Sequence, residues 1–372
     1  MTEILDVAGR LADRFAERAA RHDRDNTFPH ENYDDLREAG FLRLSVPEEL
    51  GGLGAAQREI LAVLERLAMG CGSTALAYTM HVSPLGQWAS VWRRTGNPRL
   101  ADLLRLAAEN KLVWASVTSE MGLTNLVTDA RTRADKTEGG YRVNGRKSFA
   151  TNTSVATHCT ITARHDDTLL ICRIALDQPG VRVHDVWDTL GMRATRSNDV
   201  ELDDVFVREE DVVHSLPAGH FDRRVFETVW AWAMPAFAAV YTGIAAGALE
   251  WVATRAEDDP LVRDAFGECT ALLESSRALI FRHAEEVDGG RLFELGTQDG
   301  IARCVLVKYA ATNNAVRVVQ RLVDVAGGAA YARALPFERR WRDVQAGVVM
   351  PASNHLARQL IGASPLGQVF TP

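Results

Sequence analysis

The side chains that could carry out chemistry are spread along the chain and form no compact motif. Five cysteines occur without a CxxC pair: Cys71, Cys159, Cys172, Cys269 and Cys304. Cysteines scattered in this way predict neither a zinc site nor a disulfide framework, so we expect no metal and reduced thiols in the core.

Three titratable side chains could accept a proton from a substrate: His81, Glu120 and His355. A general base must lie within hydrogen-bond reach of the proton that it removes. An isolated histidine on a helical stretch is more often a satisfied core or surface group. We therefore expect structural roles for these three residues and retain them as alternative bases.

The hydrophobic pattern divides the chain into three parts. Up to about Lys111, apolar residues recur every three or four positions, which predicts helices. From Leu112 the period falls to two, and Asn144–Gly145 between such runs predicts a β-hairpin. After Pro217 the helical period returns, with Gly327 and Gly328 as a helix stop. We expect an α+β fold with a helical domain at 1–112, a β-barrel or sandwich domain at 113–217 and a helical bundle at 218–372.

Composition argues against two kinds of partner. The chain has a net charge of −7 and no basic tract, so we expect no nucleic-acid binding. The segment 229–249 is uncharged and long enough to cross a bilayer, but it contains Pro235 and lacks a flanking Lys/Arg bias. We interpret it as a buried helix and expect no membrane association. The absence of a signal-peptide pattern at the N-terminus favours the cytoplasm.

Ordered segments along the chain resemble signatures of the acyl-CoA dehydrogenase superfamily. They are ValThrSerGlu at 117–120, LysSerPheAlaThrAsn at 147–152, LeuGlyMetArgAlaThrArgSer at 190–197, AspAspValPheVal at 203–207, ValAlaGlyGlyAlaAlaTyr at 325–331 and GluArgArgTrpArgAspVal at 338–344. The resemblance implies a flavin-dependent oxidoreductase with a helical domain, a β domain and a C-terminal four-helix bundle. It also implies a homodimer or a homotetramer.

The resemblance further implies where the flavin binds. Phe149 would pack beside the flat isoalloxazine ring, and the hydroxyls of Ser119 and Thr151 would hydrogen-bond to its polar atoms. If the resemblance is set aside, the alternative interpretation is that the two hydroxyls cap strand ends and that Phe149 fills the core. Gly327 and Gly328 either allow a close approach to the flavin or simply end a helix. The implied flavin-binding residues are Thr118, Ser119, Phe149, Thr151, Gly327, Gly328 and Ser353.

The chain departs from the family at the catalytic base. The dehydrogenases of this family remove a proton with a glutamate that aligns with Pro351, and some members place it at the position of Ala233. Neither residue can accept a proton. Because a positioned base contributes roughly 10²- to 10⁴-fold in rate, ordinary dehydrogenation is disfavoured.

A second departure concerns the adenine half of the cofactor. At 256–267 a short acidic connection stands where the family usually carries a segment that binds the adenosine diphosphate of FAD. Two acids would repel the pyrophosphate of FAD, so FMN becomes an alternative to FAD. We therefore expect the cofactor to be FAD or FMN.

The loss of the base and the loss of the adenine-binding segment occur together in one branch of the superfamily, which this chain therefore resembles. Members of that branch are flavin-dependent monooxygenases that take reduced flavin from a separate reductase. The first hypothesis is therefore a monooxygenase or oxidase acting on a small metabolite or a carrier-bound acyl group. The second is a divergent dehydrogenase of an acyl thioester with a relocated base. The third is a non-catalytic paralogue that binds a thioester or a partner subunit.

Overall fold

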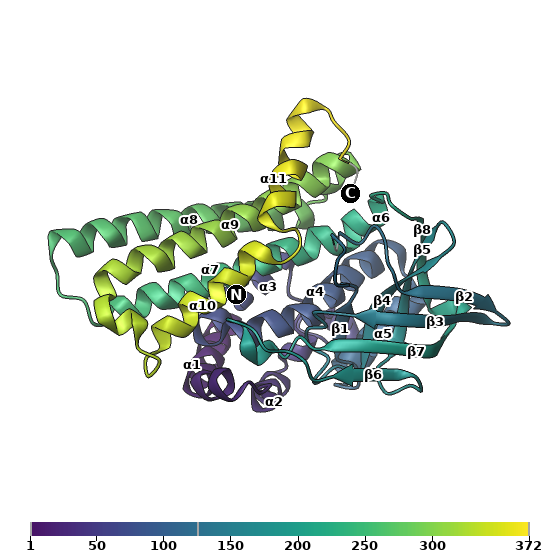
Figure 1. Ribbon diagram of the computed structural model, residues 1–372, viewed down its shortest axis with the longest axis horizontal. Coiled ribbons are helices and arrows are strands. Elements are labelled where there is room, and N and C mark those ends of the chain that lie inside the picture. The colour runs from purple at the N-terminus through teal and green to yellow at the C-terminus, as the bar shows by residue number, and fades with distance from the viewer. Residues whose placement is uncertain (1, 125, 371–372) are drawn as a thin grey trace.

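The computed structural model describes residues 2–124 and 126–370. The chain forms a helical N-terminal part, a β domain and a bundle of long C-terminal helices that extends away from the β domain (Figure 1). The predicted α+β class is confirmed. The expected boundaries after residues 112 and 217 fall between the last N-terminal helix and the first strand, and at the end of the last strand.

The N-terminal part packs closely on the C-terminal bundle. Its helices are α1 (Thr2–Asp25), α2 (His30–Glu38), α3 (Gln57–Gly70), α4 (Gly72–Thr95) and α5 (Pro98–Ala108). Glycines permit the closest crossings: a Cβ on Gly70 would lie 2.0 Å from the carbonyl oxygen of Ala12, and one on Gly243 would lie 2.1 Å from that of Glu65. Because these backbones touch, the N-terminal helices and the bundle share one hydrophobic core.

The β domain is a single branched sheet. Its strands are β1 (Trp114–Val117), β2 (Arg133–Thr137), β3 (Gly140–Lys147), β4 (His158–His165), β5 (Thr168–Ala175), β6 (Val181–His184), β7 (Asp199–Arg208) and β8 (Val212–Pro217). The order is β6-β7-β3-β2-β4-β5-β8, and β1 also pairs with β4. Because β1 and β2 lie parallel to opposite ends of β4, the sheet divides into two halves there.

The two faces of β5 have different surroundings. Leu170, Cys172 and Ile174 belong to the core inside the β domain, whereas Leu169 and Ile171 belong to the core of the helices. This alternation follows from the period of two along a strand. The half-sheet β1-β4-β5-β8 therefore turns one face toward the helical part of the molecule.

The hairpin predicted at Asn144–Gly145 is wrong. Both residues lie inside β3, where the pairing with β7 is irregular, and the β2–β3 turn falls at Glu138–Gly139. Gly145 is needed for a different reason, since a Cβ there would lie 2.6 Å from the hydroxyl oxygen of Thr132. Asn144 accepts a hydrogen bond from the Asp204 amide at 2.8 Å. A bulge and a tight turn use the same residue types, so the dipeptide alone does not distinguish them.

The C-terminal part contains the long helices of the bundle. They are α7 (Ala231–Ala253), α8 (Pro260–Asp288), α9 (Thr297–Ala326) and α10 (Pro336–Val349), with α6 (Arg223–Val225) and a π-helical turn at Phe226–Trp230 before them and α11 (Asn354–Ala363) after them. Among the described residues, the segment Arg223–Ala253 is long and apolar enough to cross a membrane, and 78% of its most apolar window is buried. It contacts α3, α4, α8, α9 and α10, so the prediction of a buried helix is confirmed.

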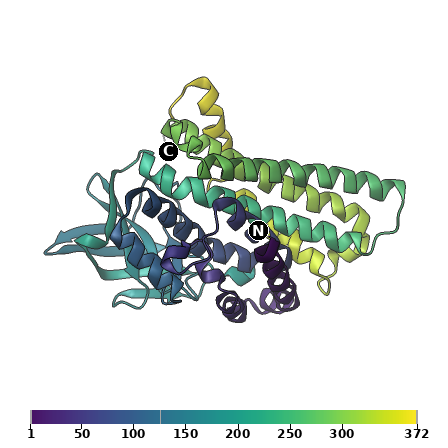
Figure 2. The same cartoon turned by 180° about the vertical axis from the view of Figure 1, so that it is seen from behind.

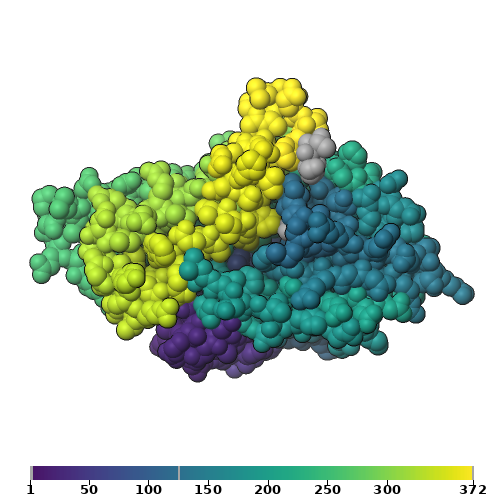
Figure 3. All heavy atoms as spheres, in the orientation of Figure 1, coloured from purple at the N-terminus to yellow at the C-terminus, as the bar shows by residue number. Residues whose placement is uncertain are grey.

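The three parts meet at the centre of the molecule. Seen from behind, the N-terminal helices lie between the β domain and the long bundle (Figure 2). The space-filling view shows the C-terminal helices, in yellow, directly against the β domain (Figure 3). Elements from both the N-terminal and the C-terminal parts therefore lie beside the β domain.

Candidate active site

A cavity of about 380 Å³ lies between the half-sheet β1-β4-β5-β8 and helices α4, α5 and α7. We call it the inner cavity. The sheet contributes Ser116, Thr118, Thr160, Ile171, Arg173 and His214, and the helices contribute Met80, Ser83, Trp88, Trp232, Ala233 and Phe237, among others. The π-helical turn before α7 also reaches the wall through Thr228 and Val229. Turns of this kind inside helices often occur at functional sites.

The walls of the inner cavity are largely apolar and aromatic. Of the residues that line it within the described chain, Glu210 is the one carboxylate. Glu210 is exposed and pairs with Arg208 at 2.6 Å, so it does not bring an acid into the interior. The inner cavity can therefore hold and shield a small molecule, but it offers no carboxylate inside for removing a proton from one.

The two expected positions of a base carry Ala233 and Pro351, neither of which can accept a proton. Ala233 lines the inner cavity and presents a methyl group to it. Pro351 lies in the turn between α10 and α11, where the ammonium of Lys308 donates to the carbonyls of Met350 and Ala352, each at 2.9 Å. Burial lowers the pKa of Lys308 to about 7. This lysine ties the turn to α9.

His81 has a structural role. It is fully buried on α4, its Nδ1 accepts from the amide of Trp114 at 3.1 Å, and its Nε2 lies 2.7 Å from the carbonyl oxygen of Leu42. Both ring nitrogens are engaged only if the imidazole is neutral, with the proton on Nε2. Burial lowers the pKa of His81 to about 4, in agreement with this tautomer. His81 connects α4 to β1 and is not available to a substrate.

Glu120 is also held by its neighbours. Its carboxylate accepts from Lys147 Nζ at 2.5 Å, from the Thr132 hydroxyl at 2.8 Å and from the amide of Arg131 at 2.8 Å. Burial raises the pKa of Glu120, but the charge and hydrogen bonds of Lys147 outweigh it, and the net pKa is lowered. An ionised carboxylate with its oxygens occupied is a structural anchor and a poor base.

His355 does not reach the inner cavity lining. It is exposed on α11, and its Nε2 lies 3.1 Å from the amide nitrogen of Gln359. Of the three alternative bases, two are therefore engaged inside the protein and one lies on its surface. The structure thus provides none of them to a substrate in the inner cavity.

Phe149 does not fill core, so that interpretation is wrong. Its side chain is 47% exposed, and its ring meets Trp187 edge to face at 6.1 Å. Its backbone has φ +58°, a conformation that costs a bulky residue on the order of 1–3 kcal/mol. The chain thus accepts strain at a position that keeps two aromatic rings at the surface, which suits a wall for a flat ligand.

Thr151 ends a chain of hydroxyl groups whose direction can be assigned. Thr195 donates to the Met192 carbonyl at 2.8 Å, so its 2.8 Å contact with Ser197 needs Ser197 as donor. Ser197 then accepts from Thr151 at 2.7 Å. With its proton used in this way, the Thr151 oxygen can still accept a hydrogen bond. It therefore suits an N–H group on a ligand, such as that of a flavin pyrimidine ring.

The structure brings two of the predicted segments together. The Ser148 amide donates to the Ser119 carbonyl at 2.9 Å, which joins the end of β1 to the segment that carries Phe149 and Thr151. Ser119 is half-buried, and Thr118 lines the inner cavity. A hydroxyl, an aromatic wall and a hydrogen-bond acceptor thus converge beside one end of the inner cavity. This combination fits an isoalloxazine ring.

The remaining flavin candidates lie on C-terminal elements. Gly327 caps α9 with φ +54°, and its amide donates to the Val323 carbonyl, so its predicted role as a helix stop is confirmed. A Cβ on Gly327 or Gly328 would meet nothing within 4 Å, which leaves open space beside both. Ser353 precedes α11, and its hydroxyl makes no capping hydrogen bond. These positions are open to a ligand or to a second subunit.

The sequence did not identify Arg99, Arg173 or His214 as residues that line a cavity. A signal was present for Arg173, which interrupts the apolar strand ThrLeuLeuIleCysArgIleAla at 168–175.

His214 lines the inner cavity as a neutral imidazole near pH 7, because burial lowers its pKa and the charge of Arg224 lowers it further. Ile171 pairs with both Thr162 and His214. His214 thus lies three strands from the Thr118 end, roughly 14 Å away at about 4.8 Å per strand.

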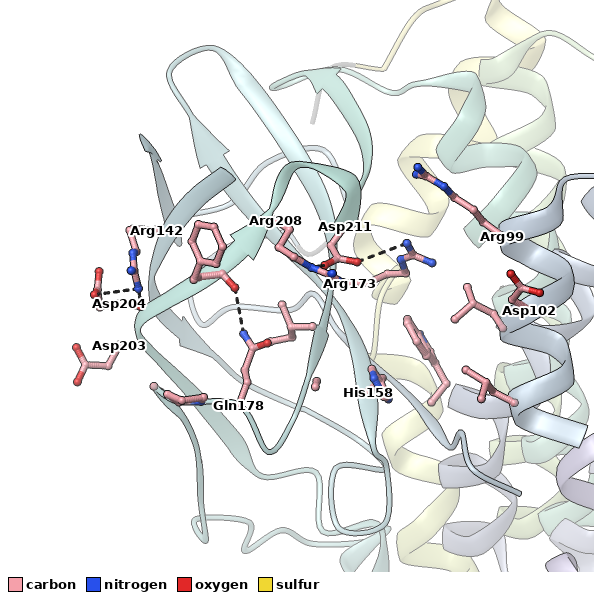
Figure 4. Close-up of a pocket in the computed structure, with 18 residues that line it drawn as sticks. Arg99, Asp102, Arg142, His158, Arg173, Gln178, Asp203, Asp204, Arg208 and Asp211 are labelled. Atoms are coloured by element: carbon pink, nitrogen blue, oxygen red, sulfur yellow. Dashed lines mark hydrogen bonds and ion pairs between the residues drawn. The ribbon is translucent and has the colours of Figure 1, made fainter. Parts of the chain in front are cut away.

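A larger groove of about 900 Å³ lies between strands of the β domain and α5. Figure 4 shows its charged residues, many of them in opposite-charge pairs such as Arg142 with Asp204. We call it the outer groove. It shares Arg99, Leu103, Trp114 and Arg173 with the inner cavity, so the two hollows meet at these residues.

The fold and the site define a three-domain flavin-dependent oxidoreductase. Models of the acyl-CoA dehydrogenase N-terminal, middle and C-terminal domains match residues 2–99, 116–205 and 224–364. The chain belongs to the acyl-CoA dehydrogenase family. The predicted superfamily and fold are thereby confirmed.

Its relatives include both dehydrogenase-like proteins and oxygenases. The putative acyl-CoA dehydrogenase YdbM of Bacillus subtilis is 30% identical over 93% of this chain and 92% of its own. The probable FMNH2-dependent monooxygenase SfnC of Pseudomonas putida is 27% identical over 92% and 89%. The structure of KijD3 with FMN and a dTDP-linked amino sugar has a TM-score of 0.87 and 27% identity, covering 100% of this chain and 94% of that one.

Proposed function

We propose that this protein is a monooxygenase that uses reduced FMN, supplied by a separate reductase, to oxygenate a small molecule in the inner cavity. The observation that carries the proposal is the lining of that cavity, which is largely apolar and aromatic and, among the described residues, holds its one carboxylate, Glu210, at the exposed surface. Removal of a proton beside a thioester needs a positioned base. Oxygen transfer from a reduced flavin does not.

The chain's own residues fit the flavin at the Thr118 end of the inner cavity. Phe149 and Trp187 would form an aromatic wall, and Thr151 would accept a hydrogen bond from a ring N–H. When bound, the reduced flavin supplies the two electrons that activate molecular oxygen. Trp88 and Trp232 would keep water out of the space where the substrate lies.

The connection before α8 supports FMN over FAD. Asp259 accepts from the amides of Leu261 and Val262, at 2.7 and 3.1 Å, and thereby caps α8. Asp258 pairs with Arg263 at 2.5 Å, so this arginine is already neutralised. An acidic helix start with an occupied arginine is a poor site for the pyrophosphate of FAD. KijD3, which has the same fold, was solved with FMN.

We also propose that the protein assembles as a homodimer or homotetramer. Large apolar side chains are exposed on its C-terminal elements, including Tyr331 at 91%, Val349 at 69% and Leu366 at 73%. Tyr331 follows Gly327 and Gly328, which border open space. A second subunit covering this surface would remove apolar area from water.

The test is oxygen incorporation. The protein is incubated with FMN, NADH, a flavin reductase and isotopically labelled oxygen gas, together with a panel of small amines, thioethers and aromatic compounds. The expected result is a product that carries one labelled oxygen atom and forms only when protein, reductase and oxygen are all present. A protein that binds FMN and incorporates no label from any compound of the panel would count against the proposal.

A further inference from the structure

Two arginines face each other where the inner cavity meets the outer groove. Arg99 stands at the start of α5 and Arg173 lies near the middle of β5, and both line the two hollows. Figure 4 shows both guanidinium groups in the space between the sheet and α5. Like charges that face each other are costly unless a counter-charge joins them. This arrangement requires an explanation.

The charge of Arg173 is only partly balanced by the protein. The Arg173 side chain is 20% exposed and lies 3.6 Å from Asp211, whose carboxylate also accepts from Arg208 Nε at 2.8 Å. The buried Nε of Arg173 has no hydrogen-bond partner among the described residues. Burial lowers the pKa of Arg173, and the charges of Arg99 and Arg208 oppose the effect of Asp211. A guanidinium with a free buried donor is unusual, because such groups are normally satisfied.

Arg99 is free to add to the same site. None of the ion pairs found in the described chain includes Arg99, and its side chain is exposed. Nearby acids are already in use: Asp102 pairs with Arg105 at 3.1 Å and Glu210 with Arg208 at 2.6 Å. The charges that face Arg99 and Arg173 therefore leave a net positive site at one end of the inner cavity.

The positive site lies far from the predicted flavin end. Thr160 pairs with Arg173 on one side and with Ser116 on the other, so all three form one row across the sheet. Thr118 lies two residues after Ser116, directly beyond the end of β1. With about 4.8 Å between strands and about 3.4 Å per residue, the backbones of Thr118 and Arg173 are roughly 12 Å apart. On the sheet side the hydroxyls of Ser116 and Thr160 lie between these ends, and the helices line the same cavity with Trp88, Trp232 and Phe237.

We propose that Arg99 and Arg173 bind an oxyanion group, such as a carboxylate, sulfonate or phosphate, at the end of the substrate opposite its reacting atom. The substrate is thus a small elongated molecule with an apolar body and one anionic end. Arginine suits this role because its planar donors match the oxygens of such groups. The inference deepens the proposed function and rests on it only in taking the inner cavity as the substrate cavity.

Binding can be tested without flavin or oxygen. Trp88, Trp114 and Trp232 line the inner cavity, so their fluorescence reports its occupation. The probes are phenylalkyl carboxylates and sulfonates of increasing length, each paired with its neutral amide, and inorganic phosphate alone. The expected result is that one length of anion binds at least about tenfold more tightly than its amide, in a salt-dependent manner.

Matched variants assign the preference to the two arginines. Arg173→Gln and Arg99→Gln should each weaken anion binding by about tenfold or more and leave amide binding unchanged. The control is Arg37→Gln, which removes an arginine on α2 that pairs with Asp34 and lines neither hollow, and it should change neither. Circular dichroism checks folding, and if Arg173→Gln does not fold, Arg99→Gln carries the test.

Several results would overturn this inference. They are equal binding of anion and amide, an unchanged preference in both folded variants, or phosphate alone binding as tightly as the organic anions. An anion preference combined with no oxygen incorporation would instead reject the proposed monooxygenase and leave the anion site intact. The two proposals therefore fail in distinguishable ways.

Discussion

Replacing Glu120 by glutamine separates a structural role from a catalytic one. The carboxylate of Glu120 is 4% exposed and holds Lys147, whose side chain is completely buried and has Thr162 as a further hydrogen-bond partner at 2.9 Å. The variant leaves a buried ammonium without its counter-charge. Breaking such a pair from one side costs about 3–5 kcal/mol.

We therefore expect Glu120→Gln to lower the melting temperature by roughly 6–10 °C, at about 2 °C per kcal/mol for a chain of this size. The assay is thermal unfolding followed by circular dichroism, with oxygen incorporation measured on the folded variant. The activity of the folded fraction should stay close to that of the unmodified protein. Glu209→Gln, which breaks the exposed pair with Lys136, is the control and should leave the melting temperature almost unchanged.

A double variant sharpens the same test. Combining Glu120→Gln with Lys147→Met removes both charges and keeps an acceptor for the Arg131 and Thr132 donors, so much of the lost stability should return. The reasoning is refuted if Glu120→Gln unfolds at the unmodified temperature and loses its activity, because Glu120 would then act on the substrate. It is also refuted if the double variant is less stable than Glu120→Gln.

Three further predictions concern His81, Gly86 and Ala233. The pKa of His81 is lowered from 6.5 to about 4, so its contribution to stability is complete above pH 6.5 and is lost as the pH falls toward 4. His81→Gln can keep both hydrogen bonds and does not titrate. Between pH 6.5 and pH 4 the unfolding free energy of this variant should therefore fall by roughly 3 kcal/mol less than that of the unmodified protein. Parallel pH profiles of the two proteins would contradict this. A Cβ on Gly86 would lie 2.5 Å from the Trp232 ring, so Gly86→Ala should cost about 1–3 kcal/mol and shift the tryptophan fluorescence, whereas Gly267→Ala, with nothing within 4 Å, should be neutral or slightly stabilising. Ala233→Glu brings a carboxylate into the inner cavity and should give slow flavin bleaching by an acyl-CoA under anaerobic conditions; no gain over the unmodified protein would show that this position does not face the reacting atom.

The sequence predicts the fold better than the site. The fold follows from patterns among residues close together in the sequence, whereas the site depends on contacts between residues far apart in it. Hydrophobic period and glycine stops are local, so the helices, the β domain and the end of α9 at Gly327 could be predicted. The Asn144–Gly145 error is local too, since a bulge and a hairpin use the same residues. What decides between them is the approach of Thr132, a contact made through the fold.

The site depends on contacts between elements far apart in the chain. His81 on α4 bonds to the amide of Trp114 on β1, and no pattern around either residue shows this pairing. Arg173 and Arg99 meet across the boundary between a strand and a helix. The absence of a base was different, because Pro351 and Ala233 could be compared directly with a known family pattern. The structure adds that no other carboxylate in the described lining replaces them inside the inner cavity.

The most direct test of the central claim is anaerobic mixing of the flavin-loaded protein with a panel of acyl-CoA thioesters. The flavin absorbance is followed as the thioester is added. Because the described residues bring no carboxylate into the interior of the inner cavity, the flavin should stay oxidised with every chain length. Prompt bleaching by any acyl-CoA would show that a base is present and that the protein is a dehydrogenase.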